Sequence, residues 1–196
     1  MSNLLSLSNI CINARGNKTA SVLDGNQRLV TSFEEPARCL FGPSTYDKDE
    51  GAARQGVPFE LTQELSEFFT HLDVWAKAYI EKESERLLGK QLSKEQVEAG
   101  YVSCVKETPG KSPLVKLKIN MPNSSRPCRF WHADASEAPW PMDWAIPFQI
   151  RVKISHLWIM GAKERAEFGF VALLEDAMAK QQPAAFPFGK SIPGAK

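Results

Sequence analysis

Basic and aromatic side chains are interleaved through the middle of this 196-residue chain. Residues 101–165 contain 10 Lys or Arg against 5 Asp or Glu, whereas the whole chain has a net charge of only +1. Residues 108–133 contain no acidic side chain. Cations that follow phosphates, together with flat rings on which bases stack, are what a protein needs to bind single-stranded nucleic acid. The candidate residues are Lys106, Lys111, Lys116, Lys118, Arg126, Arg129, Phe130, Trp131, Trp140, Trp144, Arg151 and Lys153.

Each of these residues also has a plainer explanation. Lys and Arg solvate the outer face of many sheets, and aromatic side chains often fill the core. The concentration of the cations in one block is what favours contact with a ligand. Because each neutralised phosphate releases counterions, such binding should weaken steeply as salt is added.

Two predicted strands position the central cations. Residues 147–158 and residues 114–121 both alternate apolar and polar side chains, the period of a half-buried strand. The predicted buried faces are Phe148, Ile150, Val152 and Ile154 in the first strand, and Val115, Leu117, Ile119 and Met121 in the second. The opposite faces carry Gln149, Arg151, Lys153 and Ser155, and Lys116, Lys118 and Asn120. A sheet that contains both strands would therefore be apolar inside and basic outside.

A long helix is predicted over residues 62–88. Thr62 can cap its N-terminus, and Gly89 can end it in a left-handed conformation. Its apolar residues follow helical spacing as far as Ile80. Residues 93–96 have the form of a capping box, which predicts a second, short helix that ends at Gly100.

The remaining segments read as strands and loops. The first 42 residues resemble a β-meander with a hairpin at Gly25, and residues 43–58 read as an exposed, mobile loop. Residues 133–147 contain three prolines, which exclude a central strand or helix. The apolar run over residues 168–174 predicts the last strand.

These elements predict a mainly β protein with a long helix, of the α+β class. The order of strands, helical excursion and strands fits a Greek-key β-barrel of the OB kind, with a helical insertion over about residues 60–100. A β-sandwich is the competing architecture. We expect one domain over residues 1–178 and a flexible C-terminal tail over residues 179–196.

Catalysis is not expected. The three histidines, His71, His132 and His156, have no nucleophile at a recognisable spacing, and no phosphate-binding, dinucleotide-binding or metalloprotease motif occurs. The acidic run over residues 47–50 reads as a solvated loop. We therefore expect no catalytic residue, no metal and no cofactor.

The chain reads as an intracellular protein. No window approaches the roughly 18 consecutive apolar residues of a membrane span, so no membrane partner is expected. The first 16 residues make a poor signal peptide, because they lack a basic start and Ser and Asn interrupt the apolar residues. The four cysteines are widely scattered, which is typical of a reduced compartment.

Four parts of the chain resemble one protein family: residues 33–43, the basic strand over residues 115–119, Trp131, and residues 150–170. Together they are similar to the OB-fold single-stranded DNA-binding proteins of phages and large DNA viruses. The resemblance implies sequence-tolerant binding in replication, recombination or repair, in the cytoplasm of a bacterial host or the nucleus or cytoplasm of a virus-infected cell. It points to Lys116, Lys118, Trp131, Arg151 and Lys153 as binding residues. The C-terminal residues depart from that family, because they are not acidic.

The sequence therefore predicts a non-enzymatic protein that binds single-stranded DNA. Backbone charge and stacking do not distinguish the sugar, so RNA stays an alternative partner. A homo-oligomer is compatible with the sequence. The alternative function is a structural or assembly protein that uses helix 62–88 and the Pro-rich loops for subunit contacts.

Overall fold

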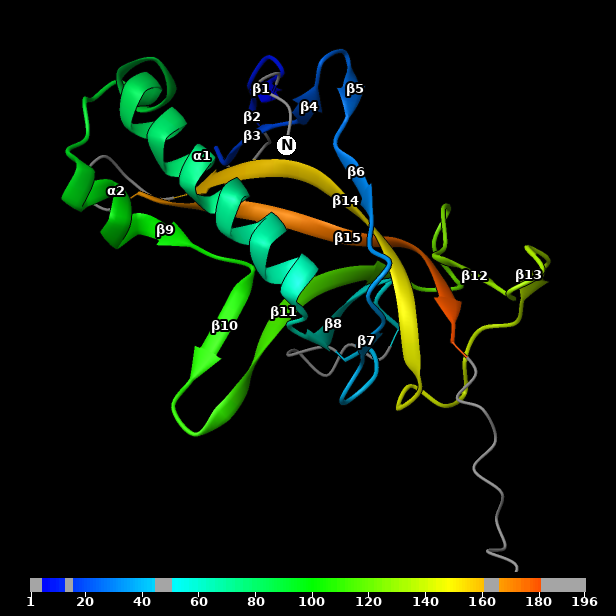
Figure 1. Cartoon of the computed structure of the whole chain (residues 1–196). Coiled ribbons are helices and arrows are strands. Elements are labelled where there is room, and N and C mark those ends of the chain that lie inside the picture. Colours follow the sequence, from blue (N-terminus) through cyan, green and yellow to red (C-terminus); the bar gives the residue numbers. More distant parts are fainter. Residues whose placement is uncertain (1–4, 13–15, 45–50, 161–165, 181–196) are drawn as a thin grey trace, which may run out of the picture.

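Two long neighbouring strands form the spine of the molecule. The computed structural model describes residues 5–12, 16–44, 51–160 and 166–180. Within them, β14 (Pro147–Met160) and β15 (Glu167–Ala179) pair antiparallel along almost their whole length (Figure 1). The predicted buried face of β14 is confirmed, since its four apolar side chains are at most 2% exposed. β15 extends five residues beyond the predicted end at residue 174, because Ala177 continues its buried face.

Short strands from the N-terminal third flank β14. β3 (Lys18–Ala20), β6 (Val30–Ser32) and β7 (Ala37–Arg38) each pair with β14, and β2 (Cys11–Ile12) pairs with β3. A separate three-stranded sheet contains β1 (Leu5–Leu7), β4 (Val22–Asp24) and β5 (Gln27–Arg28), and the predicted hairpin at Gly25 joins β4 to β5. The predicted meander is only partly formed, because β2 pairs with β3 and β4 pairs with β5, whereas β3, β6 and β7 pair with β14.

Strands from the middle of the chain flank β15 on its other side. They are β9 (Tyr101–Val102), β11 (Lys111–Asn120) and β12 (Arg129–Trp131), all parallel to β15. β10 (Val105–Thr108) and β8 (Arg54–Glu60) pair with β11, and β13 (Glu137–Ala138) pairs with β12. The predicted faces of β11 are confirmed for Val115, Leu117 and Ile119, which are buried. The two lysines between them, Lys116 and Lys118, are exposed.

The strand β8 corrects one prediction. The segment 43–58 reads as a loop, but its residues 54–58 belong to a strand that continues to residue 60, and Val57 and Phe59 of this strand are buried in the core. Gly56 and Pro58 alternate with these two residues on the opposite face, and they conceal the strand pattern in the sequence.

The strands form an open sheet. Among the described residues, the larger sheet runs β10-β11-β15-β14-β3-β2, and its two ends do not pair with each other. The described residues are therefore mostly β with two helices, one of them long, and they do not form the closed barrel expected from the sequence. The two ends of this path are β10 and β2, and β2 has only two residues.

The helices have the predicted boundaries. α1 (Gln63–Leu88) begins after Thr62, whose side chain accepts a hydrogen bond from the backbone N–H of Leu65 at 3.3 Å, and it ends at Gly89 with φ 72°. α2 (Lys94–Gly100) has the predicted capping box at Ser93. No helix in the described part of the chain has the length and apolar character to cross a membrane.

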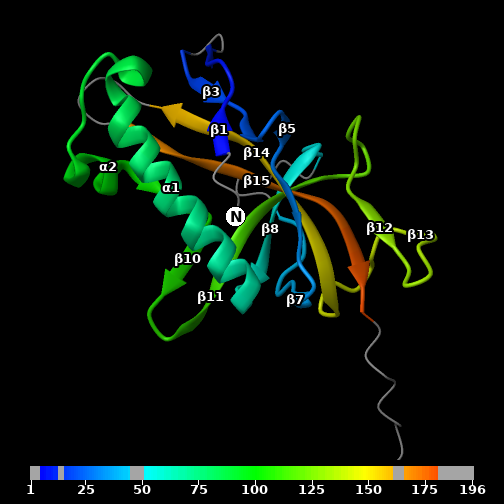
Figure 2. The same cartoon turned by 45° about the horizontal axis from the view of Figure 1, so that its top comes forward.

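Helix α1 covers one face of the sheet, as Figure 2 shows. Its apolar stripe is buried, and Trp75 stacks on Phe170 of β15 with ring centroids 6.3 Å apart. Phe68 meets Phe33 edge to face at 5.3 Å. This face of β14 and β15 is therefore the core, and the opposite face is left for other roles. Of the expected tail, Ala179 belongs to β15 and residues 181–196 lie outside the described residues.

Candidate nucleic-acid interface

The side chains of β14, β15 and their neighbours that point away from α1 form one continuous surface, which we call the outer face. Residues paired directly across strands project to the same side of a sheet. Three such rows lie side by side on the outer face. They are Lys118–Leu173–Lys153, Arg129–Asp176–Arg151 and Trp131–Met178–Gln149.

A β-bulge places two acidic side chains in the middle of this surface. Arg151 pairs with Asp176 and Val152 pairs with Leu174, so Glu175 is an extra residue on β15. Such a residue breaks the alternation of the strand and redirects side chains. As a result, Glu175 and Asp176 both contact cations on the outer face, although they are consecutive.

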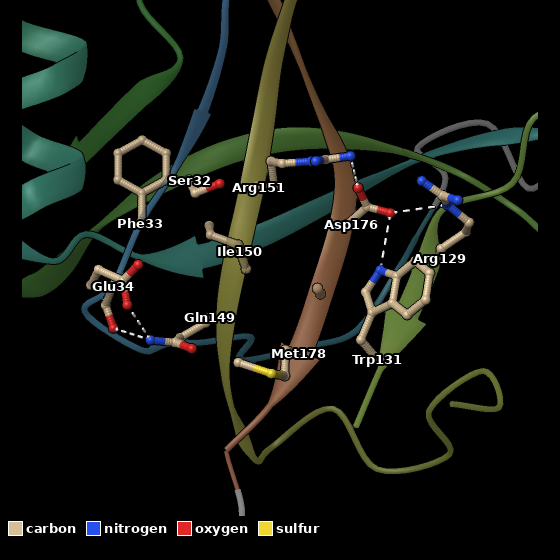
Figure 3. Close-up of a pocket in the computed structure, with 11 residues that line it drawn as sticks. Ser32, Phe33, Glu34, Arg129, Trp131, Gln149, Ile150, Arg151, Asp176 and Met178 are labelled. Carbon is tan, nitrogen blue, oxygen red and sulfur yellow. Dashed lines mark hydrogen bonds and ion pairs between the residues drawn. The ribbon is translucent and has the colours of Figure 1, made fainter. Parts of the chain in front are cut away.

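Asp176 binds three side chains at once (Figure 3). Its Oδ1 accepts hydrogen bonds from Arg129 Nε at 3.1 Å and from Trp131 Nε1 at 3.2 Å, and its Oδ2 forms an ion pair with Arg151. The guanidinium of Arg129 also lies 5.1 Å from the centre of the Trp131 ring, a cation–π contact. Asp176 is only 6% exposed. Its contacts fix the orientation of the Trp131 ring.

Glu175 makes looser contacts. Its carboxylate lies 3.2 Å from Lys153 Nζ and 3.8 Å from Arg151 Nε. Among the described residues, that Nε is the buried side-chain nitrogen left without a hydrogen-bond partner. Arg129, Arg151 and Lys153 are therefore all paired with carboxylates, and the outer face is less positive than the sequence predicts.

Two hollows adjoin on the outer face. The first, of about 410 Å³, has its floor on β14 and β15 and lies between Trp131 on β12 and Glu34 after β6. Gln149 crosses it and donates hydrogen bonds to the Glu34 carbonyl and carboxylate at 2.8 and 3.0 Å. The second, of about 400 Å³, is lined by Arg126, Lys153 and Glu175, and both hollows include Arg129. Cations and a tryptophan thus border a continuous depression.

The outer face continues to the far end of β14, where sequence analysis identified no site residue. Strict alternation after Ile154 would bury Trp158, but a second register shift between Ile154 and His156 turns it onto the outer face, beside Gly169. A Cβ on Gly169 would lie 3.1 Å from Trp158 Cζ2, so the glycine makes room for the ring. The sequence does contain a signal for this change of face. Leu157 and Ile159 are apolar and buried at odd-numbered positions, whereas the buried residues up to Ile154 are at even-numbered positions.

Further cations surround this end of the face. Burial, followed by the charges of Arg54 and Arg28, lowers the pKa of His156. Arg28 donates to the Ser155 carbonyl at 3.2 Å, and Arg54 Nε donates to Asn120 Oδ1 at 2.9 Å. Both arginines lie in the N-terminal part of the chain, outside the basic block, and only the fold brings them here.

The structure brings together seven of the predicted site residues. These are Lys116, Lys118, Arg126, Arg129, Trp131, Arg151 and Lys153, on or beside the outer face. Lys106 and Lys111 are exposed on the β10–β11 hairpin, which projects from the body of the sheet in Figures 1 and 2.

The other three predicted residues form an aromatic cluster. Phe130 is 4% exposed, and its ring centroid lies 5.1 Å from that of Trp140, 5.7 Å from that of Trp144 and 6.2 Å from that of Phe148. Trp140 and Trp144 are half-buried against the core through these contacts. Phe130 points inward because its neighbours Arg129 and Trp131 occupy the outer face, and in this position it cannot stack on a base.

Within the described residues, no group of three or more His, Cys, Asp or Glu side chains is placed to hold a metal ion. The acidic run over residues 47–50 lies outside them.

Comparison with known proteins gives a weak likeness. No protein-family model matches the chain, and no curated protein matches it. Among solved structures, the chain is similar to the single-stranded DNA-binding protein of bacteriophage Enc34 in complex with ssDNA. The TM-score is 0.42 and the identity 10%, over 94% of this chain and 99% of that one. Another structure of the phage protein gives a TM-score of 0.43 and 8% identity, over 97% and 96% of the chains. The expected resemblance is therefore present only as a weak likeness of fold.

Proposed function

We propose that this protein binds single-stranded DNA along its outer face, without regard to sequence and without catalysing a reaction. The observation that carries the proposal is the strand register, which gathers Lys118, Lys153 and Trp131 on the face opposite α1. Cations along the strands would contact phosphates, and the half-buried rings of Trp131 and Trp158 would stack on bases through their accessible sides. Stacking reads no base edge, which makes the binding tolerant of sequence.

The path of the DNA would follow β14. Gln149, in the row of Trp131, and Trp158 lie nine residues apart on this strand, which is about 30 Å at the usual rise of a strand. A single strand laid along this line would meet a tryptophan at each end, with Arg151 and Lys153 between them. Protection of single strands in replication, recombination or repair of a phage or viral genome is the biological role that fits such binding.

Tryptophan fluorescence during titration with a dT oligonucleotide of 30 nucleotides tests the proposal. We expect saturable quenching at low salt that is relieved by high salt, because phosphate contacts weaken as salt is added. Trp131→Leu should remove part of the quenching and weaken binding by about 5- to 150-fold, the range for one stacked base.

Trp131→Phe is the matched control, because it keeps a ring on which a base can stack and should bind more tightly than Trp131→Leu. Binding by Trp131→Leu as tight as that of the wild type would contradict the proposal. Parallel titrations with duplex DNA and with a U oligonucleotide report the preference between single strand and duplex and between DNA and RNA.

Assembly with a protein partner is the second candidate. The apolar stripe of α1 is buried within the chain and does not serve it. The exposed apolar side chains of the described residues include Leu40 and Phe41, at 41% and 75%, and Met142 in the Pro-rich loop, at 101%. An apparent molar mass from light scattering that rises with protein concentration at high salt would favour this function, if Phe41→Ser abolishes the rise.

A further inference from the structure

We infer that the two neighbouring carboxylates of β15 have opposite effects on nucleic-acid binding. Asp176 positions the side chains that bind, whereas Glu175 competes with phosphate for the same cations. The inference rests on the proposed function, because it concerns the affinity of the outer face for single-stranded DNA. It assigns roles to two residues that have the wrong charge for this ligand.

Asp176 is held in place on the outer face by contacts with three side chains. Its carboxylate is almost wholly buried and accepts from Trp131 and Arg129 while it pairs with Arg151. A carboxylate has room for about four hydrogen bonds, so these three donors use most of its capacity. An incoming phosphate therefore finds these donors already held, and removal of the carboxylate would leave them without a partner.

Trp131 depends on Asp176 in two ways. The indole N–H donates directly to Asp176, and Arg129, which also donates to Asp176, lies over the indole ring. The contacts among the three groups fix the plane of the ring at the edge of the first hollow. A ring held in its binding orientation loses less conformational entropy when a base stacks on it. Asp176 is thus a positioning residue.

Glu175 has none of these features. Its side chain is 30% exposed, and its closest cation is Lys153, itself 27% exposed, at 3.2 Å. Its second contact, at 3.8 Å, leaves the Arg151 Nε without a hydrogen bond. Glu175 is thus held by a single short contact that remains partly open to solvent, and phosphate offers the same cations an equivalent anion. Glu175 therefore neutralises binding cations without ordering them.

The two residues allow a matched comparison. Asp176→Asn and Glu175→Gln each replace a carboxylate by the amide of the same shape, and each makes the outer face more positive by one charge. If the carboxylates acted only through charge, both variants would bind DNA more tightly. We expect opposite changes, since only Asp176 holds Trp131.

The experiment is fluorescence anisotropy of a labelled dT oligonucleotide of 30 nucleotides, at several salt concentrations. Glu175→Gln should bind more tightly, and the slope of log K against log salt should steepen by up to about 0.7, the value of one added phosphate contact to a single strand. Asp176→Asn should bind about fivefold more weakly or worse, the low end of the contribution of one stacked base.

A measurement on the free protein separates positioning from folding. Asp176→Asn should change the tryptophan emission and its quenching by acrylamide, and the same substitution in a Trp131→Phe background should change neither. Asp176→Glu keeps the charge but lengthens the side chain, so it should also weaken binding while the salt slope stays unchanged. This second variant keeps the test valid if Asp176→Asn unfolds.

The outcomes distinguish this inference from the proposed function. Wild-type protein that does not bind the oligonucleotide at low salt would overturn the proposed function and the inference together. Wild-type protein that binds, with both amide variants binding more tightly or both more weakly, would overturn the inference alone. Tighter binding by Glu175→Gln with weaker binding by Asp176→Asn, or by Asp176→Glu where Asp176→Asn does not fold, would support both.

Discussion

Replacement of Lys118 by glutamine measures whether phosphates lie on the outer face. Lys118 is exposed on β11 and shares a row with Lys153, with Leu173 of β15 between them. For single strands, each phosphate contact contributes about 0.7 to the slope of log K against log salt. Loss of one contact should therefore reduce the slope by about 0.7. Between 50 and 200 mM salt, the affinity advantage of the wild type over Lys118→Gln should shrink about 2.6-fold, since four raised to the power 0.7 is about 2.6.

The assay is anisotropy of a labelled dT oligonucleotide at four or more salt concentrations in that range. Lys82→Gln is the matched control, because Lys82 is exposed on α1, which packs on the core face of the sheet. Its slope should equal that of the wild type. If Lys118→Gln and Lys82→Gln both keep the wild-type slope, phosphates do not contact this row and the reasoning from strand register is refuted.

Three further predictions concern stability and reactivity. Gly169→Ala should lower the free energy of unfolding, measured by urea denaturation, by about 1–3 kcal/mol, because the new Cβ would lie 2.4 Å from the Val102 carbonyl oxygen. Gly56→Ala is the control and should change this free energy much less, because its Cβ would lie 3.5 Å from the nearest atom. The pKa of His156 is lowered in the folded state from its ordinary value of 6.5. The unfolded chain therefore takes up the proton first, and stability present above pH 6.5 is lost as the pH falls through the folded pKa. His156→Gln should reduce the fall in the urea midpoint between pH 7 and pH 5, and an unchanged fall would contradict this. Ellman's reagent should react rapidly with one cysteine of the native protein, the exposed Cys11, and with all four after denaturation, because burial protects the other three and raises the pKa of each thiol.

Local signals in the sequence predicted the elements well. Thr62 and Gly89 bracket α1 because capping and the left-handed conformation are decided by one or two residues. The faces of β11 and of the first half of β14 followed from their alternation, since burial on one side imposes a period of two. These predictions needed no knowledge of which strands are neighbours.

What the sequence did not predict depends on pairing between distant segments. The acidic partners of Arg151 and Lys153 come from β15 and reach them only because Glu175 forms a bulge, which alternation within one strand does not reveal. Trp158 was missed for the same reason. The prediction of a closed barrel was wrong for the same reason. The number of strands in a sequence does not say whether the two edge strands of a sheet pair with each other.

The place of the spine late in the chain has a consequence for folding during synthesis. β6 and β7 pair only with β14, β3 pairs with β14 and β2, and β9 and β12 pair with β15. While the ribosome is still translating residues before 147, these earlier strands lack their partners in β14 and β15. Completion of the larger sheet therefore waits for nearly the whole described chain, and long-range pairing of this kind is slow. Until then the nascent chain exposes unpaired apolar strands, which makes it a natural client for chaperones that bind such segments.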